Sequence, residues 1–178
     1  TDMFYNVLKN PLCSGYVWNK LFKKNIIEQR EPLRFSEKIT IVEDEQFVLE
    51  YICRSKNMSL SGKNMYAYRN NENGAIRKNF TEKKLTCIWG REDVWKICNE
   101  EKCDDKILGI AWNKLMQVYV YAYRNILYHN IPDKQYWKDV VKKKFFLYVK
   151  LPYKIDETWN WKPKMIYYFM KYCLKDKN

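Results

Sequence analysis

One segment repeats apolar residues at intervals of three and four over about five turns of helix. Its apolar positions are Leu108, Ala111, Leu115, Val118, Tyr119, Ala122 and Ile126. An apolar face of this length needs packing partners along the whole helix, because exposing it to water is unfavourable. The sequence therefore predicts a long amphipathic helix that packs against other helices.

Further helices are predicted on both sides of this segment. Helical spacing recurs at residues 85–95, 136–148 and 165–173. Gly90 is a candidate break in the first of these, and Pro163 fits the start of the last. The acidic pair Asp104 and Asp105 fits an N-terminal cap of the long helix. Residues 80–178 are therefore predicted to form a helical bundle.

Residues 1–79 have a mixed pattern. Helical spacing covers 42–54, where Thr40 and Glu43 fit a capping box. Short strands are predicted at 16–22, 58–60 and 64–69, with a short helix at 23–29 and a turn at 70–74. The predicted fold class is α+β, mainly α: a mixed α/β part at 1–79 followed by the helical bundle at 80–178.

Composition excludes several classes of protein. The chain is 47% hydrophobic with only 5 Gly and 5 Pro, so it is expected to fold. Its longest apolar runs, such as 145–149 and 165–170, are much shorter than the roughly 20 residues of a membrane-spanning helix. No secretory signal stands at the N-terminus. Because the first residue is Thr1 and not Met, we expect a processed product or a piece of a longer protein.

The positive charge is concentrated at the C-terminal end. The net charge is +12, and the excess of Lys and Arg over Asp and Glu is 4 in residues 1–79, 1 in 80–132 and 7 in 133–178. A cationic end rich in Trp and Tyr suits nucleic acid, an anionic membrane surface or a phosphorylated substrate. The alternative is that scattered lysines only solvate the helices.

The cysteines do not predict a metal site. None of the six has the two-residue spacing of a zinc ribbon or a redox dithiol, and the chain has one histidine, His129. Reduced thiols in a cytosolic protein are the favoured interpretation.

One acidic cluster stands out at residues 43–45, at the start of a predicted helix. Acidic residues in a first helical turn complement the helix dipole, and Glu43 also fits the cap, so a purely structural role is open. The functional alternative is a carboxylate held at a cleft as a general base for a hydroxyl nucleophile.

Four short motifs surround this cluster in order. They are Val-Trp-Asn-Lys-Leu-Phe-Lys-Lys at 17–24, Leu-Arg-Phe at 33–35, Val-Glu-Asp-Glu-Gln-Phe at 42–47 and Tyr-Ala-Tyr-Arg at 66–69. Together they resemble the second half of bacterial family 2 glycosyltransferases, which often build capsular or lipopolysaccharide sugars. The resemblance implies the C-terminal half of a GT-A fold in residues 1–79, followed by a helical C-terminal extension.

The resemblance also implies roles for single residues. Asp44 is then the base that deprotonates the acceptor hydroxyl in an inverting transfer, and Glu43 orients it or caps the helix. Trp18 lines the sugar or acceptor cleft, Lys20 approaches the donor phosphate and Arg69 contacts pyrophosphate. The structural alternatives are a core tryptophan, a surface lysine pair and a salt-bridged arginine.

The family's first half is not represented in this chain. It is an α/β nucleotide-binding unit that ends in an Asp-x-Asp motif, which holds a divalent metal, Mg²⁺ or Mn²⁺, on the donor diphosphate. Neither feature occurs here. We therefore expect a fragment of a longer enzyme, with no metal bound to this part and no turnover of its own.

Partners and location follow from the same resemblance. The full-length enzyme is expected to use a nucleotide-sugar donor and a sugar or lipid-linked acceptor in the cytoplasm, with peripheral contact of the basic C-terminal helices at the inner face of the plasma membrane. The alternatives are a basic, aromatic-rich nucleic-acid-binding module, which is less favoured, and a non-catalytic module that forms homodimers through the region of Tyr119 and Tyr123.

Overall fold

The computed structural model describes residues 2–29, 31–63, 65–67, 69 and 80–174. Every regular element in these ranges is a helix. The helices are α1 (Asp2–Leu8), α2 (Lys24–Ile27), α3 (Glu43–Cys53), the 3-10 helix η1 (Glu82–Thr86), α4 (Cys87–Glu100), α5 (Asp105–Tyr128), α6 (Lys134–Tyr148) and α7 (Trp161–Cys173). The mainly helical character predicted from the sequence is confirmed.

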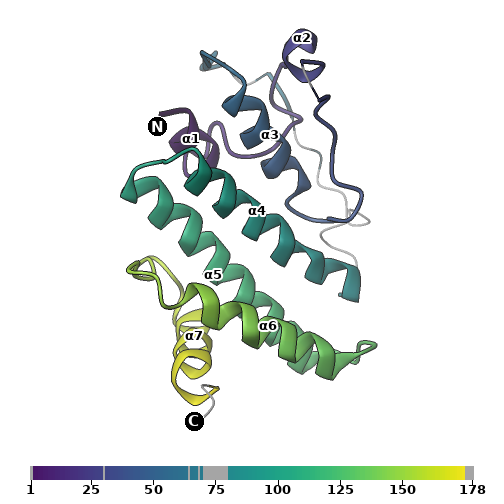
Figure 1. Ribbon diagram of the computed structural model, residues 1–178, viewed down its shortest axis with the longest axis vertical. Coiled ribbons are helices and arrows are strands. Elements are labelled where there is room, and N and C mark those ends of the chain that lie inside the picture. Colours follow the sequence, from purple (N-terminus) through teal and green to yellow (C-terminus); the bar gives the residue numbers. More distant parts are fainter. Residues whose placement is uncertain (1, 30, 64, 68, 70–79, 175–178) are drawn as a thin grey trace.

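Helices α4 and α5 form the centre of the molecule (Figure 1). They run antiparallel and side by side. Helices α1, α2 and α3 lie at one end of the molecule, and α6 and α7 lie at the other. The predicted helices at 42–54, 85–95, 136–148 and 165–173 correspond to α3, α4, α6 and α7.

Helix α5 forms where the periodicity predicts it. The side chain of Asp104 accepts a hydrogen bond from the backbone N–H of Ile107 at 2.9 Å, which confirms the predicted cap. The buried face of α5 includes Trp112, whose indole N–H donates to the carbonyl of Tyr148 in α6 at 2.8 Å. The long helix is therefore fixed at its start and held to α6.

Two hydrophobic cores lie on opposite sides of the α4–α5 pair. The C-terminal core joins α4–α7, and its largest fully buried side chains are Trp112, Tyr119, Phe145, Leu85, Ile88, Leu115, Met116, Ile126 and Met170. The N-terminal core joins α1, α3, α4 and α5 through Phe4, Val7, Leu8, Cys13, Val42, Val48, Leu49, Ile52, Cys87, Val94, Cys98, Ile107 and Ala111. The N-terminal core thus holds helices from both sides of residue 80, while the division into domains at 1–79 and 80–178 stays a prediction.

Gly90 does not break α4. The helix continues through it, and a Cβ atom built there lies 3.0 Å from Cβ of Val42 and 3.1 Å from Cγ2 of Ile39. Glycine is therefore present because the segment before α3 approaches the backbone of α4 closely. The prediction of a break at this position was wrong.

The predicted capping box at the start of α3 was also wrong. The N-cap position is Val42, which makes no side-chain cap and has a left-handed backbone with φ of 85°. The backbone N–H of Thr40 donates instead to the Thr86 hydroxyl at 3.0 Å. Packing of the buried Val42 side chain against Gly90 holds this conformation, which is rare for a β-branched residue.

The predicted mixed α/β half is not seen in the described residues. Residues 16–22, 58–60, 65–67 and 69 contain no strand. Strands need hydrogen-bonded neighbours, and these segments pack through side chains instead, as when Phe22 contacts Phe47 and Tyr51 of α3. The predicted turn at 70–74, together with Asn64 and Tyr68, lies outside the described residues.

Two further predictions concern membrane-spanning helices and the state of the cysteines. None of the described helices combines the length and the apolar character that crossing a lipid bilayer requires. The six cysteines are free thiols, of which Cys13, Cys87 and Cys98 are buried.

Candidate functional site

Three acidic residues in the first turn of α3 lie in different surroundings. Glu45 is buried, whereas Glu43 and Asp44 are half-buried. One carboxylate oxygen of Asp44 accepts from the backbone N–H of Glu45 at 2.8 Å. Burial raises the pKa of Asp44, and the negative charge of Glu45 raises it further. Burial likewise raises the pKa of Glu43.

Glu45 joins three helices through ion pairs. Its carboxylate accepts from the guanidinium of Arg91 in α4, and from the ammonium of Lys114 in α5 at 3.1 Å. The side chains of Glu45, Arg91 and Lys114 are only 7%, 16% and 24% exposed. Burial lowers the pKa of Lys114, while the Glu45 charge opposes that shift. The position of Asp44 is therefore set by a rigid ionic anchor at its neighbour.

Two polar atoms beside this anchor have no partner among the described residues. They are Nε of Arg91 and Oε1 of Gln46, both buried. Buried polar atoms are normally hydrogen-bonded, so a donor for Gln46 Oε1 and an acceptor for Arg91 Nε are expected from water or a ligand.

Lys20 organises the loop that faces the start of α3. Its ammonium donates to the carbonyl oxygens of Cys13, Ser14 and Tyr16, each at 2.7 Å. Burial lowers the pKa of Lys20, and the nearby charge of Asp44 acts in the opposite direction. In this structure Lys20 holds the loop beside Asp44, and its contact with a donor phosphate stays a prediction.

Gly15 in this loop is expected to be intolerant of a larger side chain. A Cβ atom at Gly15 lies 2.4 Å from Cγ and 2.6 Å from Cβ of Glu45, so Gly15→Ala must displace the anchored carboxylate. We expect a loss of about 1–3 kcal/mol in the free energy of unfolding, measured by urea denaturation.

The matched control for Gly15 is Gly109, inside α5. There a Cβ atom lies 3.5 Å from Tyr153, an ordinary contact, so Gly109→Ala is expected to raise the free energy of unfolding by up to about 1 kcal/mol. Equal effects of the two substitutions would contradict the close approach at Gly15.

Trp18 belongs to an exposed row of aromatic rings. It stacks on Tyr16 with ring centroids 5.2 Å apart and on Tyr66 with centroids 4.5 Å apart. The Trp18 side chain is 38% exposed, so it is not the core tryptophan of the structural alternative. Arg69, near the end of the same segment as Tyr66, is exposed and forms no ion pair with other described residues.

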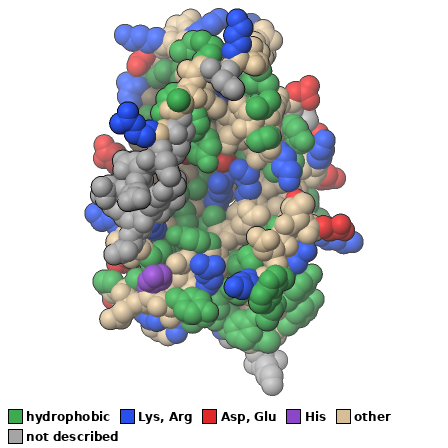
Figure 2. Space-filling model, turned by 180° about the vertical axis from the view of Figure 1, so that it is seen from behind, with side chains coloured by type: hydrophobic (Ala, Val, Ile, Leu, Met, Phe, Trp, Pro, Cys, Tyr) green, Lys and Arg blue, Asp and Glu red, His purple; other side chains and the backbone are tan. Residues whose placement is uncertain are grey.

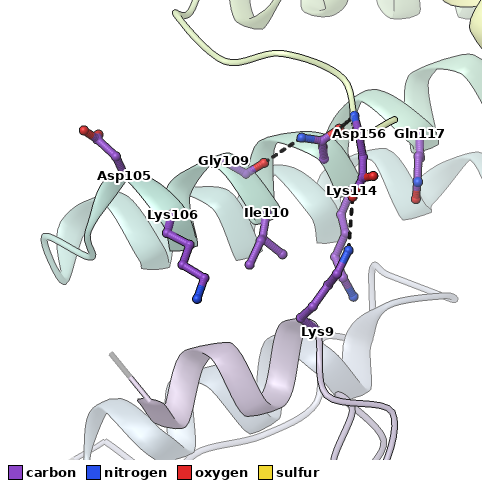
Figure 3. A pocket seen from close by; sticks show the side chains of 9 residues that line it. Lys9, Asp105, Lys106, Gly109, Ile110, Lys114, Gln117 and Asp156 are labelled. Atoms are coloured by element: carbon purple, nitrogen blue, oxygen red, sulfur yellow. Dashed lines mark hydrogen bonds and ion pairs between the residues drawn. The ribbon is translucent and has the colours of Figure 1, made fainter. Parts of the chain in front are cut away.

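A groove of about 310 Å³ lies between α1, α5 and the loop before α7 (Figure 3). Lys9 at the end of α1 reaches across it to Asp156 at 3.1 Å. Asn113 of α5 holds the same loop by donating to the carbonyl of Lys154 at 2.9 Å and accepting from the N–H of Asp156 at 2.6 Å. Lys114 also lines the groove, so the groove leads to the Glu45 anchor.

Sequence reasoning missed Arg91 and Lys114. Both interrupt the apolar stripe of their helix: Arg91 lies four residues after Cys87, and Lys114 lies three residues after Ala111. A cation on a buried stripe requires a carboxylate partner. Those two interruptions, together with the acidic turn at 43–45, were the sequence signal from which an ionic cluster between the helices could have been predicted.

The described residues contain no group of three or more His, Cys, Asp and Glu side chains that could hold a metal ion. The divalent metal implied by the resemblance belongs to the Asp-x-Asp motif of the other half of such enzymes, so its presence there stays a prediction.

Comparisons with the models of known protein families, with curated proteins and with solved structures find no match to this chain. The motifs and the geometry around α3 are therefore the features that bear on function.

Proposed function

We propose that this chain is the acceptor-side part of a nucleotide-sugar-dependent glycosyltransferase of bacterial surface polysaccharide synthesis, with Asp44 as the general base of an inverting transfer. The observation that carries the proposal is that the four motifs, separated along the chain, contact one another: the first and second pack on Phe47 of the third in α3, and the first stacks on the fourth. Chance matches scattered along a helical protein have no reason to contact one another.

Aromatic contacts join the motifs. Phe22 of the first motif packs edge-on against Phe47 of the third, with centroids 5.6 Å apart, and Phe35 of the second stacks on Phe47 at 4.5 Å. Trp18 of the first motif stacks on Tyr66 of the fourth. Each motif thus contacts at least one other, and Phe47 lies one helical turn after Asp44.

The surroundings of Asp44 suit a general base. Burial raises the pKa of Asp44, which makes it a better proton acceptor than an exposed aspartate, and backbone hydrogen bonds and the charge of Arg91 oppose that shift. The left-handed Val42 two residues earlier is a strained backbone position, and such positions cluster at functional sites. The exposed row of Tyr16, Trp18 and Tyr66 offers faces on which a pyranose ring can stack.

The donor, the acceptor and the metal complete the proposal. The donor is a nucleotide sugar whose diphosphate is held by a divalent metal on an α/β unit joined to this chain, and the acceptor is a sugar or lipid-linked sugar. In this proposal Trp18 lines the sugar or acceptor cleft and Glu43 orients Asp44. Lys20 approaches the donor phosphate and Arg69 contacts the pyrophosphate. The reaction takes place in the cytoplasm.

The coding sequence upstream of Thr1 tests this proposal directly. We expect a βαβ segment that ends in an Asp-x-Asp motif, which would supply the donor-binding half. A start codon immediately before Thr1, or an unrelated upstream domain, would contradict the proposal.

A further inference from the structure

Helix α7 has two apolar faces. One face packs into the C-terminal core through Tyr167 and Met170. The other is exposed and consists of Trp161, Met165, Tyr168, Phe169 and Tyr172. Trp161, Met165 and Tyr172 are 65%, 62% and 67% exposed. An amphipathic helix on a protein surface normally presents polar residues there, so this exposed stripe requires an explanation.

The exposed stripe is bordered by lysines on both sides. At about 100° per residue, its five side chains fall within an arc of roughly 100° around the helix axis. Lys162 lies at one edge of the arc, and Lys164 and Lys171 lie at the other. The ammonium of Lys162 lies 5.4 Å from the centre of the Trp161 ring, and that of Lys171 lies 5.6 Å from the Tyr172 ring.

The end of α5 extends this surface. Leu127 and Tyr128 are exposed, and they line an apolar groove of about 280 Å³ with Met165 and Phe169 of α7. Arg124 lines the same groove. In the space-filling view, hydrophobic side chains gather at the end of the molecule that α7 occupies, with cationic side chains beside them (Figure 2). The sequence of α7, like residues 106–128 of α5, contains no Asp or Glu.

We propose that this α7 face, formed by the five exposed side chains of α7 together with Leu127, Tyr128 and Arg124, docks on an anionic lipid membrane. Aromatic side chains with a polar edge favour the membrane–water interface, and a helix that lies in the interface has an apolar arc bordered by cations. Lysines beside the arc reach anionic headgroups while their stems stay apolar. The proposal does not depend on the chemistry proposed for Asp44.

Two other occupants fit the surface less well. A second copy of this chain would bring Lys162, Lys171 and Arg124 of both copies together with no carboxylate on either α7, and like charges at an interface are unfavourable. Nucleic acid needs cations along the centre of its binding surface, whereas here the centre consists of Met165 and Phe169.

Vesicle co-sedimentation of the full chain tests the proposal. The chain is expected to bind vesicles of equal parts phosphatidylcholine and phosphatidylglycerol, and to bind phosphatidylcholine alone much more weakly. The double substitution Met165→Ser with Phe169→Ser is expected to weaken partitioning by about tenfold or more. Lys162→Gln with Lys171→Gln is expected to weaken it to a similar extent, at about tenfold or more, because each lysine near the surface contributes.

Matched controls lie at the other end of the molecule. Leu12→Ser with Leu21→Ser removes two side chains that are 79% and 98% exposed, and Lys23→Gln with Lys24→Gln removes the same charge as the α7 lysine pair. Neither control is expected to change partitioning more than about twofold. Because the changed side chains are exposed, except for the half-buried Lys171, all four variants should keep the helical circular dichroism of the parent.

Three outcomes would overturn the proposal. One is that the full chain fails to bind the anionic vesicles, or that the α7 variants and the controls bind them equally. Another is that the chain sediments as a dimer that the Met165 and Phe169 substitutions dissociate, which identifies a second copy as the occupant. The third is tight, salt-sensitive binding of single-stranded DNA that the same variants lose.

Discussion

If the proposed function is correct, replacing Asp44 with Asn in the complete enzyme is expected to lower kcat by about 10²–10⁴-fold. Asn has the shape of the aspartate and can still accept from the Glu45 N–H, but it cannot take the proton of the acceptor hydroxyl. Binding of the donor nucleotide should survive, because the donor contacts other residues. Steady-state kinetics with a saturating acceptor, together with nucleotide binding by calorimetry, measure both quantities.

Glu50 provides the control for Asp44. It lies on the same helix and accepts from the amide of Gln46 at 3.0 Å, so Glu50→Gln should leave kcat within about twofold of the parent. In the parent, kcat should fall as the pH drops through the raised pKa of Asp44, because only the ionised form accepts a proton. Full activity of Asp44→Asn would remove Asp44 as the base.

Replacing Glu45 with Gln is expected to lower the free energy of unfolding by about 3–5 kcal/mol. The substitution keeps the volume of the side chain but leaves Arg91 and Lys114 together without a counter-charge in a buried site. Removing one member of a buried ionic cluster costs much more than the cluster itself contributes. Urea denaturation followed by circular dichroism provides the measurement.

Two further results identify the cause of that loss. Glu28→Gln removes an exposed pair with Arg34 and is expected to cost less than about 1 kcal/mol. The difference in the free energy of unfolding between the parent and Glu45→Gln should shrink as the pH rises towards 10.5, the ordinary pKa of lysine. Burial lowers the pKa of Lys114 in the folded state and Glu45 opposes that shift, so the pKa falls further in the variant. Over that range the unfolded chain binds more protons than the folded one, and the stability of the variant therefore rises with pH more than that of the parent. A deficit independent of pH would point to lost packing instead of unpaired charge.

The helices from α3 to α7 were predictable because their signals are local. The three-and-four spacing that defines α5 depends only on which residues follow one another, and the Asp104 cap acts within one turn. The acidic turn at 43–45 was visible for the same reason. These features arise from interactions a few residues apart along the chain.

The errors all involve interactions that are distant in sequence. Strands were expected at 16–22 and 64–69, but a strand exists only with a hydrogen-bonded neighbour, and aromatic packing replaces it for Phe22 and Tyr66. The Thr40 cap failed because Thr86, on another helix, takes its backbone N–H. Arg91 and Lys114 interrupt the apolar stripes of their helices, but that both pair with Glu45 follows only from the packing of α3, α4 and α5.

Gly90 restricts how this sequence can diverge. Any larger residue there meets Val42 and Ile39, as well as the carbonyl oxygen of Ile41 at 3.3 Å. The cost of a change at position 90 therefore depends on which residue occupies position 42, so the two substitutions are not additive. In related chains these two positions should co-vary: because the atom met is the Cβ of Val42, a lineage that loses the glycine at 90 should have glycine at 42, which also suits the left-handed backbone there. A substitution at position 90, which has no catalytic role, is thereby linked to the backbone conformation of Val42, two residues before Asp44.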